Sequence, residues 1–208
     1  MFTGIVTDIG TVAARDGTTL AIASHYDPAS VMLGASIACD GCCLTVTSVE
    51  DEGGGALFEV DVSNETASRT TLGHWKPGTR INLERSLSFG SELGGHLMTG
   101  HIDGLARIVT RMPDGESARF VLEAPAEFAQ FIAAKGSVAL NGVSLTVNEV
   151  EGASFGVNII PYTLKHTTWG DRKPGNLVNL EVDLLARYVE RIAAGRLAAS
   201  RAISEQDR

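Results

Sequence analysis

The sequence repeats itself, and this internal duplication restricts the fold more than any other feature. The block Ala38–Val46 (ACDGCCLTV) returns at 139–147 as ALNGVSLTV, and the Thr-Gly pair at 3–4 returns at 99–100. KPG at 76–78 and NLE at 82–84 return in the same order at 173–175 and 179–181. The offset between copies runs 96, then 101, then 97, so insertions fall between blocks, as surface turns allow. A tandem duplication therefore predicts two similar domains, 1–96 and 97–183, followed by a segment at 184–208.

Each copy has the sequence pattern of an all-β domain. Short runs rich in Val, Ile, Thr and Phe alternate with Gly, Asp, Asn and Pro, and in the first copy they predict strands at 4–13, 19–24, 36–38, 44–50, 57–62 and 80–84. Asp40-Gly41 and Asn141-Gly142 each lie between apolar residues and predict hairpins with a type I′ turn, which needs positive φ at both central positions. Six short strands in about 90 residues favour a small closed barrel over two packed sheets.

The segment from 184 to 203 has no counterpart in the first copy and predicts a helix. Its apolar residues fall on one face at helical spacing, namely Leu185, Val189, Ile192, Ala193 and Leu197. Such a stripe needs a partner. Self-association is favoured over packing against its own barrels, because most soluble oligomers are homo-oligomers. Shorter helices are predicted at 65–71, 127–134 and 163–168.

Composition excludes several classes of function. With 44% hydrophobic and 20% charged residues the chain is a globular protein and too apolar for disorder. A net charge of −8 without clustered Lys and Arg argues against nucleic-acid binding. No apolar run is long enough to span a bilayer, and the first residues lack the pattern of a signal peptide. Three cysteines make no disulfide framework, so we expect a cytoplasmic protein.

The spacing of Cys39 and Cys42 is that of metal ligands, and His96 with His101 could complete a zinc site. The repeat argues against this interpretation, because the second copy has Leu140 and Val143 in place of the two cysteines. Small core residues are the better interpretation, and no metal is expected. No dinucleotide loop, P-loop or nucleophile elbow occurs either.

Two positions of the repeat carry polar residues that are candidates for a ligand contact or for catalysis. Cys43 corresponds to Ser144, so both copies keep a small hydrogen-bonding group before Leu-Thr-Val, which suggests a ligand contact, although a strand-edge role is the alternative. His101 replaces Ile5 directly after the repeated Thr-Gly. A histidine titrates near neutrality, so this residue is a candidate general acid or base.

The motifs MFTGIV, DGCCLTV, GGHLMTGH, NGVSLTV and IPYTLKHTT together resemble the riboflavin synthase alpha chain family, over essentially all 208 residues. The resemblance implies two tandem six-stranded Greek-key barrels, a homotrimer held by the C-terminal helix, and no cofactor. It implies that two 6,7-dimethyl-8-ribityllumazine molecules dismutate by transfer of a four-carbon unit. The products are riboflavin and 5-amino-6-ribitylamino-pyrimidinedione. An association with lumazine synthase is left open, and a non-catalytic lumazine- or flavin-binding antenna protein of the same fold is the alternative.

The resemblance also carries site residues onto this chain. It implies functional roles for Phe2, Cys43, His101, Ser144, Thr146 and Asp183. In the first barrel the implied ligand contacts are Gly4, Ile5, Val6, Cys43, Leu44, Thr45, Asp61, Val62, Ser63, Asn64, Glu65 and Thr66. In the second barrel they are Gly100, His101, Ile102, Lys135, Ser144, Leu145, Thr146, Asn158, Ile159, Ile160, Pro161, Tyr162 and Thr163. Tyr162 departs from the family, which often has an acidic residue there.

A dismutation treats two identical molecules differently, so the two copies must differ where they bind ligand. The matched positions that differ pair Ile5 with His101, Cys43 with Ser144, Gly34 with Lys135, Asn64 with Pro161, and Glu65 with Tyr162. On this alignment we expect His101 and Lys135 to distinguish the second barrel.

Overall fold

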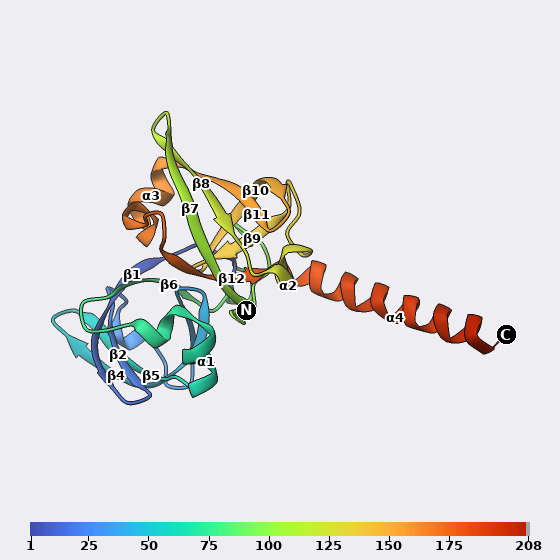
Figure 1. Cartoon of the computed structure of the whole chain (residues 1–208). Helices are drawn as coiled ribbons and strands as arrows, with labels where there is room; N and C mark the ends of the chain where they lie inside the picture. Colours follow the sequence, from blue (N-terminus) through green and yellow to red (C-terminus); the bar gives the residue numbers. More distant parts are fainter. Residues whose placement is uncertain (207–208) are drawn as a thin grey trace.

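The chain folds into two closed antiparallel β-barrels of six strands each, followed by one long helix (Figure 1). The computed structural model describes residues 1–206, and in the last helix it describes side chains as far as Arg196. The all-β fold predicted from the repeat is confirmed.

Both barrels have the same strand order. The first consists of β1 (Asp8–Asp16), β2 (Thr19–Ala23), β3 (Ser36–Cys39), β4 (Cys42–Glu52), β5 (Gly55–Asp61) and β6 (Arg80–Arg85). The second consists of β7 (Gly104–Asp114), β8 (Ser117–Glu123), β9 (Ser137–Leu140), β10 (Val143–Glu151), β11 (Ser154–Ile159) and β12 (Leu177–Val182). In each, the second strand pairs with the fifth and the third with the sixth, so the connections are of the Greek-key kind.

Short helices cover the ends of the barrels. They are η1 (Pro28–Ser30), α1 (Asn64–Arg69), η2 (Thr71–His74), α2 (Ala126–Ala129), α3 (Pro161–His166) and η3 (Thr168–Asp171). The helix predicted at 127–134 is observed only as far as Ala129, so the prediction is wrong for the residues after it. There the chain turns into β9 through Lys135, whose φ of 66° no helix can hold.

Each barrel closes around its own apolar core. Inward-facing residues alternate along the strands, and the second core centres on Phe120, which meets Trp169 edge to face with ring centroids 4.9 Å apart. In the first core Cys39 and Cys42 lie among Val, Leu and Phe side chains, as the comparison of the copies predicts. Burial raises the pKa of Cys42 to about 12, so this thiol stays protonated and packs as a small apolar group.

The two predicted hairpin turns bring the barrels together. Asp40 and Gly41 have φ of 43° and 83°, and Asn141 and Gly142 have φ of 46° and 75°, as a type I′ turn requires. The turns touch, since a Cβ on Gly41 would lie 2.7 Å from the nitrogen of Gly142. Only glycine permits this approach of one backbone to the other.

Two asparagines from the repeated NLE motif fasten this contact. The side-chain amide of Asn82 donates to the Asn141 carbonyl at 2.8 Å, and that of Asn179 donates to the Asp40 carbonyl at 2.9 Å. Their side-chain oxygens accept the amides of Thr168 and Thr71 respectively. Each of these bonds from the first barrel to the second has an equivalent from the second barrel to the first. The barrels are therefore related by an approximate twofold axis. Buried polar groups satisfied in this way rigidify an interface.

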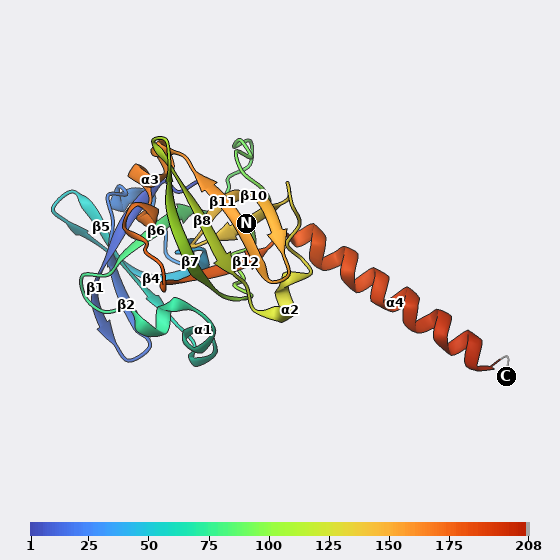
Figure 2. The same cartoon turned by 45° about the horizontal axis from the view of Figure 1, so that its top comes forward.

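The last helix, α4 (Leu184–Gln206), projects away from both barrels (Figures 1 and 2). Three residues of the predicted stripe are exposed, with 73% of Leu185, 66% of Val189 and 58% of Ile192 accessible. The side chain of Leu197 is not among those that the structure describes, and the tail residues 207–208 lie outside the described residues. Within its described length α4 does not pack its apolar stripe on its own barrels, and no described helix is long and apolar enough to cross a bilayer.

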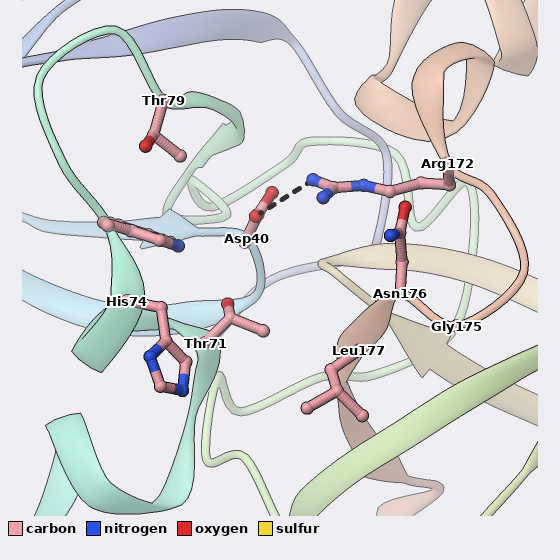
Figure 3. A pocket seen from close by; sticks show the side chains of 9 residues that line it. Asp40, Thr71, His74, Thr79, Arg172, Gly175, Asn176 and Leu177 are labelled. Atoms are coloured by element: carbon pink, nitrogen blue, oxygen red, sulfur yellow. Dashed lines mark ion pairs between the residues drawn. The ribbon is translucent and has the colours of Figure 1, made fainter.

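The approximate symmetry is broken at one buried ion pair (Figure 3). Asp40 is only 2% exposed, and its Oδ2 lies 3.6 Å from Nη2 of Arg172, across a cavity of about 360 Å³ between the barrels. The equivalent positions hold the neutral residues Asn141 and Trp75. Burial raises the pKa of Asp40 to about 6, although Arg172 and the Asn82 amide act against the rise.

The burial of Asp40 predicts a pH-dependent stability. Below about pH 4 Asp40 is protonated in both states, whereas between about 4 and 6 only the unfolded chain releases its proton. The contribution of Asp40 to the unfolding free energy therefore decreases as pH rises, by roughly 3 kcal/mol over two pKa units. We expect Asp40→Asn to have a flatter profile of unfolding free energy between pH 4 and 7 in urea titrations.

The reciprocal change supplies the control. Asn141→Asp places a buried carboxyl where tryptophan stands instead of arginine, so its profile should fall more steeply than that of the wild type. Parallel profiles for all three proteins would contradict the assignment.

Candidate functional site

The segment that precedes each barrel is not a strand of that barrel. The strand predicted at 4–13 begins only at Asp8, because Gly4 has φ of 78° and the chain there leaves the sheet. The carboxylate of Glu84 in β6 holds this segment by accepting the amides of Thr3 and Gly4 at 2.7 and 2.9 Å. In the second copy Glu181 of β12 accepts the amides of Thr99 and Gly100 in the same way.

Each held segment reaches across to the other barrel. The carbonyl of Gly4 accepts the amide of Ser144 in the second barrel at 2.9 Å, and the carbonyl of Gly100 accepts the amide of Cys43 in the first at 2.9 Å. The structure therefore sets Gly4, Ile5 and Val6 against the second barrel, and Gly100, His101 and Ile102 against the first, whereas the sequence groups each segment with its own barrel.

Packing supports this exchange. Val6 packs against the core of the second barrel, and Ile102 packs against the core of the first. Each candidate site thus contains strands of one barrel and the leading segment of the other. Side-chain and backbone groups that are distant in sequence meet because the twofold contact places both segments between the barrels.

The two glutamates that hold the segments are buried carboxyls. Burial raises the pKa of Glu84 and of Glu181, and the hydrogen bonds from the threonines and backbone amides partly lower it. Each carboxyl also accepts the hydroxyl of its threonine, at 2.8 Å from Thr3 and 2.7 Å from Thr99. Such charge-assisted bonds are about twice as strong as neutral ones, so they fix both segments firmly.

Phe2 lies on the axis between the barrels and is fully buried. Its amide donates to the Met98 carbonyl at 2.9 Å, and the Met98 amide donates back at 3.0 Å. Together with Ala38 and Ala139 these two residues form a small apolar cluster. Phe2 therefore holds the exchanged segments in place, which is a positioning role.

A pocket opens where the first segment meets the second barrel. It has a volume of about 130 Å³ and is lined by Gly4, Ile5, Val6, Val143, Ser144, Tyr162, Thr163, His166 and Thr167. Six of these nine residues were expected from the sequence. The pocket is smaller than the 300 to 1,000 Å³ typical of ligand sites.

The helices after the fifth strand of each barrel differ. In the first barrel Ser63 caps α1 by accepting the Thr66 amide at 3.0 Å, and Glu65 lies in the first turn. In the second barrel Pro161 opens α3, and Tyr162 stacks on His166 with ring centroids 4.1 Å apart. Tyr162 thus places an aromatic surface beside the pocket where the first copy has Glu65.

The remaining expected contacts divide by burial. Leu44, Val62, Leu145 and Ile159 are buried core residues, so only their backbones could meet a ligand. Asp61 accepts the Thr19 hydroxyl, and Asn158 donates to Asp114. The other side chains are accessible along the strands and turns that surround the sites, namely Thr45, Asn64, Lys135, Thr146 and Ile160.

His96 was considered only as a metal ligand, yet it lies at the second site. Its Nδ1 is 2.7 Å from the Ser144 hydroxyl, and its Nε2 is buried without a described partner. Burial lowers the pKa of His96, and the charge of Asp183 acts against this. Among the described residues no three His, Cys, Asp or Glu side chains gather as a metal site would require.

Asp183 lies at the start of the last helix. Its Oδ1 accepts the amide of Leu185 at 2.9 Å, which is the bond of an N-cap residue. Asp183 therefore links the helix to the surroundings of His96.

The exchange gives the two sites unlike chemistry. The first brings His101 to the barrel of Cys43 and Glu65, and the second combines Ile5 with Ser144 and His96. The titratable groups expected to distinguish the second barrel are thus redistributed, because the segment of His101 lies against the first barrel.

Comparison with known proteins agrees with this architecture. The profile described as "Lumazine binding domain" matches residues 3–86 and 99–183. The chain is 52% identical to riboflavin synthase of Brucella abortus (strain 2308) over 93% of this chain and 98% of that one. It is 42% identical to riboflavin synthase of Mycobacterium bovis (strain ATCC BAA-935 / AF2122/97), over 92% and 98%.

Solved structures share the fold. The chain resembles LumP complexed with riboflavin with a TM-score of 0.74 and 26% identity, over 88% of this chain and 99% of LumP. LumP complexed with 6,7-dimethyl-8-(1'-D-ribityl) lumazine also gives 0.74, with 22% identity and the same coverage.

The exchange predicts an unequal cost for two glycine substitutions. Gly4 and Gly17 both have positive φ, so alanine strains each by roughly 1 to 2 kcal/mol. A Cβ on Gly4 would also lie 2.5 Å from Ser144, whereas Gly17 has no neighbour within 4 Å. We expect Gly4→Ala to lose about 1 to 3 kcal/mol more unfolding free energy than Gly17→Ala in urea titrations. Equal losses would show that the segment does not press on the second barrel.

Proposed function

This chain belongs to the lumazine-binding domain family, and we propose that it catalyses the riboflavin synthase reaction. Two molecules of 6,7-dimethyl-8-ribityllumazine dismutate as one donates a four-carbon unit to the other, which yields riboflavin and 5-amino-6-ribitylamino-pyrimidinedione. The observation that carries this proposal is the pair of exchanged sites, one per barrel, in a chain 52% identical to a riboflavin synthase over nearly its whole length.

A duplicated binding module suits a reaction between two like molecules. Holding both in oriented sites turns a bimolecular step into an intramolecular one, which lowers the barrier by up to roughly 7 to 11 kcal/mol in favourable cases. The same fold binds the same ring twice, and the unlike residues of the two sites let one molecule give and the other receive.

The site residues have the chemistry that this substrate needs. The ring edge of a lumazine alternates hydrogen-bond donors and acceptors, which backbone groups beside Thr45, Thr146 and the runs 61–66 and 158–163 can match. Gly4 and Gly100 let their segments approach Ser144 and Cys43 of the opposite barrel closely, which brings both segments to the sites. The methyl group of the substrate is acidic, so a base must take its proton. We assign this acid–base role to His101, which the exchange brings to the barrel of Cys43.

A homotrimer is the assembly that we propose. The apolar stripe of α4 is exposed in the single chain, and the pocket at Ser144 has a volume of only about 130 Å³. Burial of the helix against its copies could bring the first barrel of one subunit to the second barrel of a neighbour, where the two bound molecules would react. A cytoplasmic location and an association with lumazine synthase are further hypotheses, which fractionation and co-purification would test.

The reaction itself gives the first test. The purified chain incubated with the lumazine should form riboflavin and the pyrimidinedione in a one-to-one ratio after exhaustive chelation of metals. Absorbance and chromatography follow both products. Ligand binding without turnover would instead indicate an antenna protein, and activity restored only by zinc would contradict the absence of a metal.

The second test concerns His101. His101→Ile makes the segment at the first site copy Ile5, so we expect the single-turnover rate to fall by on the order of 100-fold with little change in ligand affinity. Thr3→Ala changes a residue shared by both copies and should weaken packing or binding instead. If His101→Ile binds far more weakly yet reacts at the normal rate when saturated, His101 is a binding residue.

The third test removes α4. A chain that ends at Asp183 should sediment as a smaller species that binds ligand but reacts slowly, because the two sites no longer face each other. Undiminished turnover by the truncated monomer would rule out a site between subunits.

A further inference from the structure

Asp103 follows His101 by two residues and is held from two sides. Its backbone amide donates to the Leu180 carbonyl at 2.8 Å, and its Oδ2 accepts the amide of Val182 at 2.8 Å. Its Oδ1 pairs with the guanidinium of Arg187. The Asp103 side chain is only 5% exposed, so this carboxylate depends on its few partners for stabilisation.

Arg187 belongs to the first turn of α4. Its guanidinium pairs with Asp103 and so joins the projecting helix to the loop that carries His101. The two surfaces face each other across a hollow of about 550 Å³, lined by Thr99, His101, Ile102 and Asp103 on one side and by Leu184, Arg187 and Tyr188 on the other, with Met1 between.

The other end of the loop is fixed independently of the helix. Thr99 and Gly100 are bound by Glu181, and the amide of His101 contacts the Thr99 hydroxyl at 3.4 Å. After His101 the loop is held by the two bonds of Asp103 to β12, and Arg187 adds a third contact to the same carboxylate.

The first copy lacks this arrangement. Thr7 stands where the second copy has Asp103, and its hydroxyl bonds the Tyr26 hydroxyl at 2.6 Å and the Leu83 carbonyl at 3.3 Å, both in the first barrel. No helix follows β6. The connection thus occurs only on the loop with a histidine, since the equivalent loop has Ile5.

We propose that Asp103 and Arg187 are positioning residues for His101, and that they transmit the placement of α4 to the site. When α4 packs in the oligomer, the Arg187 guanidinium sets the Asp103 carboxylate and with it the loop. This inference rests on the proposed function, because it takes His101 as the acid–base group. A broken pair leaves a nearly buried carboxylate without its cation, so the loop would shift to reach water.

The test compares Arg187→Gln and Asp103→Asn with Arg119→Gln. The control removes a cation from the exposed Arg119–Glu149 pair on the outer face of the second barrel. We expect both test variants to sediment as the wild type does and to lose roughly tenfold or more in kcat with little change in KM. Arg187→Lys, which keeps the charge, should recover part of the loss, and Arg119→Gln should match the wild type.

A double-mutant cycle separates positioning from a general structural role. In the His101→Ile background, Arg187→Gln should cause no further loss, because the residue that it positions is absent. An equal loss in both backgrounds, a wild-type kcat for Arg187→Gln, or dissociation of the oligomer would each overturn the proposal.

One readout does not need turnover. The imidazole resonances of His101, followed by NMR against pH, should move in Arg187→Gln and Asp103→Asn but not in Arg119→Gln. If the wild type makes no riboflavin, the proposed function fails, while these spectra still decide whether Arg187 acts on His101. Unchanged His101 resonances in both test variants would overturn the inference whatever the activity.

Discussion

The structure depends on two buried carboxylates that hold the chain segment preceding each barrel. Glu84 and Glu181 each accept two backbone amides and one hydroxyl, and this fixes segments that would otherwise be free loops. Since the barrels meet around an approximate twofold axis, each segment lies against the opposite barrel. Both candidate sites exist only because of this exchange, so neither barrel alone would form a complete site.

Duplication followed by exchange explains how a symmetric scaffold can carry out an asymmetric reaction. The shared parts, namely the turns, the glutamates and the asparagine bonds, give the two leading segments equivalent positions against the opposite barrels. The differences are few, and the exchange combines them in pairs: His101 with Cys43 at one site, Ile5 with Ser144 and His96 at the other. The ion pair of Asp40 and Arg172 shows that the interface itself is also not symmetric, because the equivalent positions hold Asn141 and Trp75.

The last helix stands outside the duplication and adds what two barrels lack. Its apolar stripe is exposed, the charge of Asp183 before its first turn acts on His96, and Arg187 pairs with Asp103 in the His101 loop. In the proposed trimer, assembly and site geometry would share the same few residues at the start of α4.

The sequence by itself determined the features that depend on local conformation or on the repeat. The strand punctuation, the two turns with positive φ at Asp40 and Asn141, and the helical stripe each follow from residues close together in the chain, and the repeat doubles the evidence. It also indicated the residues of the second pocket, although not their grouping. The tertiary structure decided which barrel each segment joins, the bond of His96 to Ser144 and the pairing of Asp40 with Arg172. These contacts join residues far apart in sequence, and no local pattern records which of two nearly equivalent barrels a segment will meet.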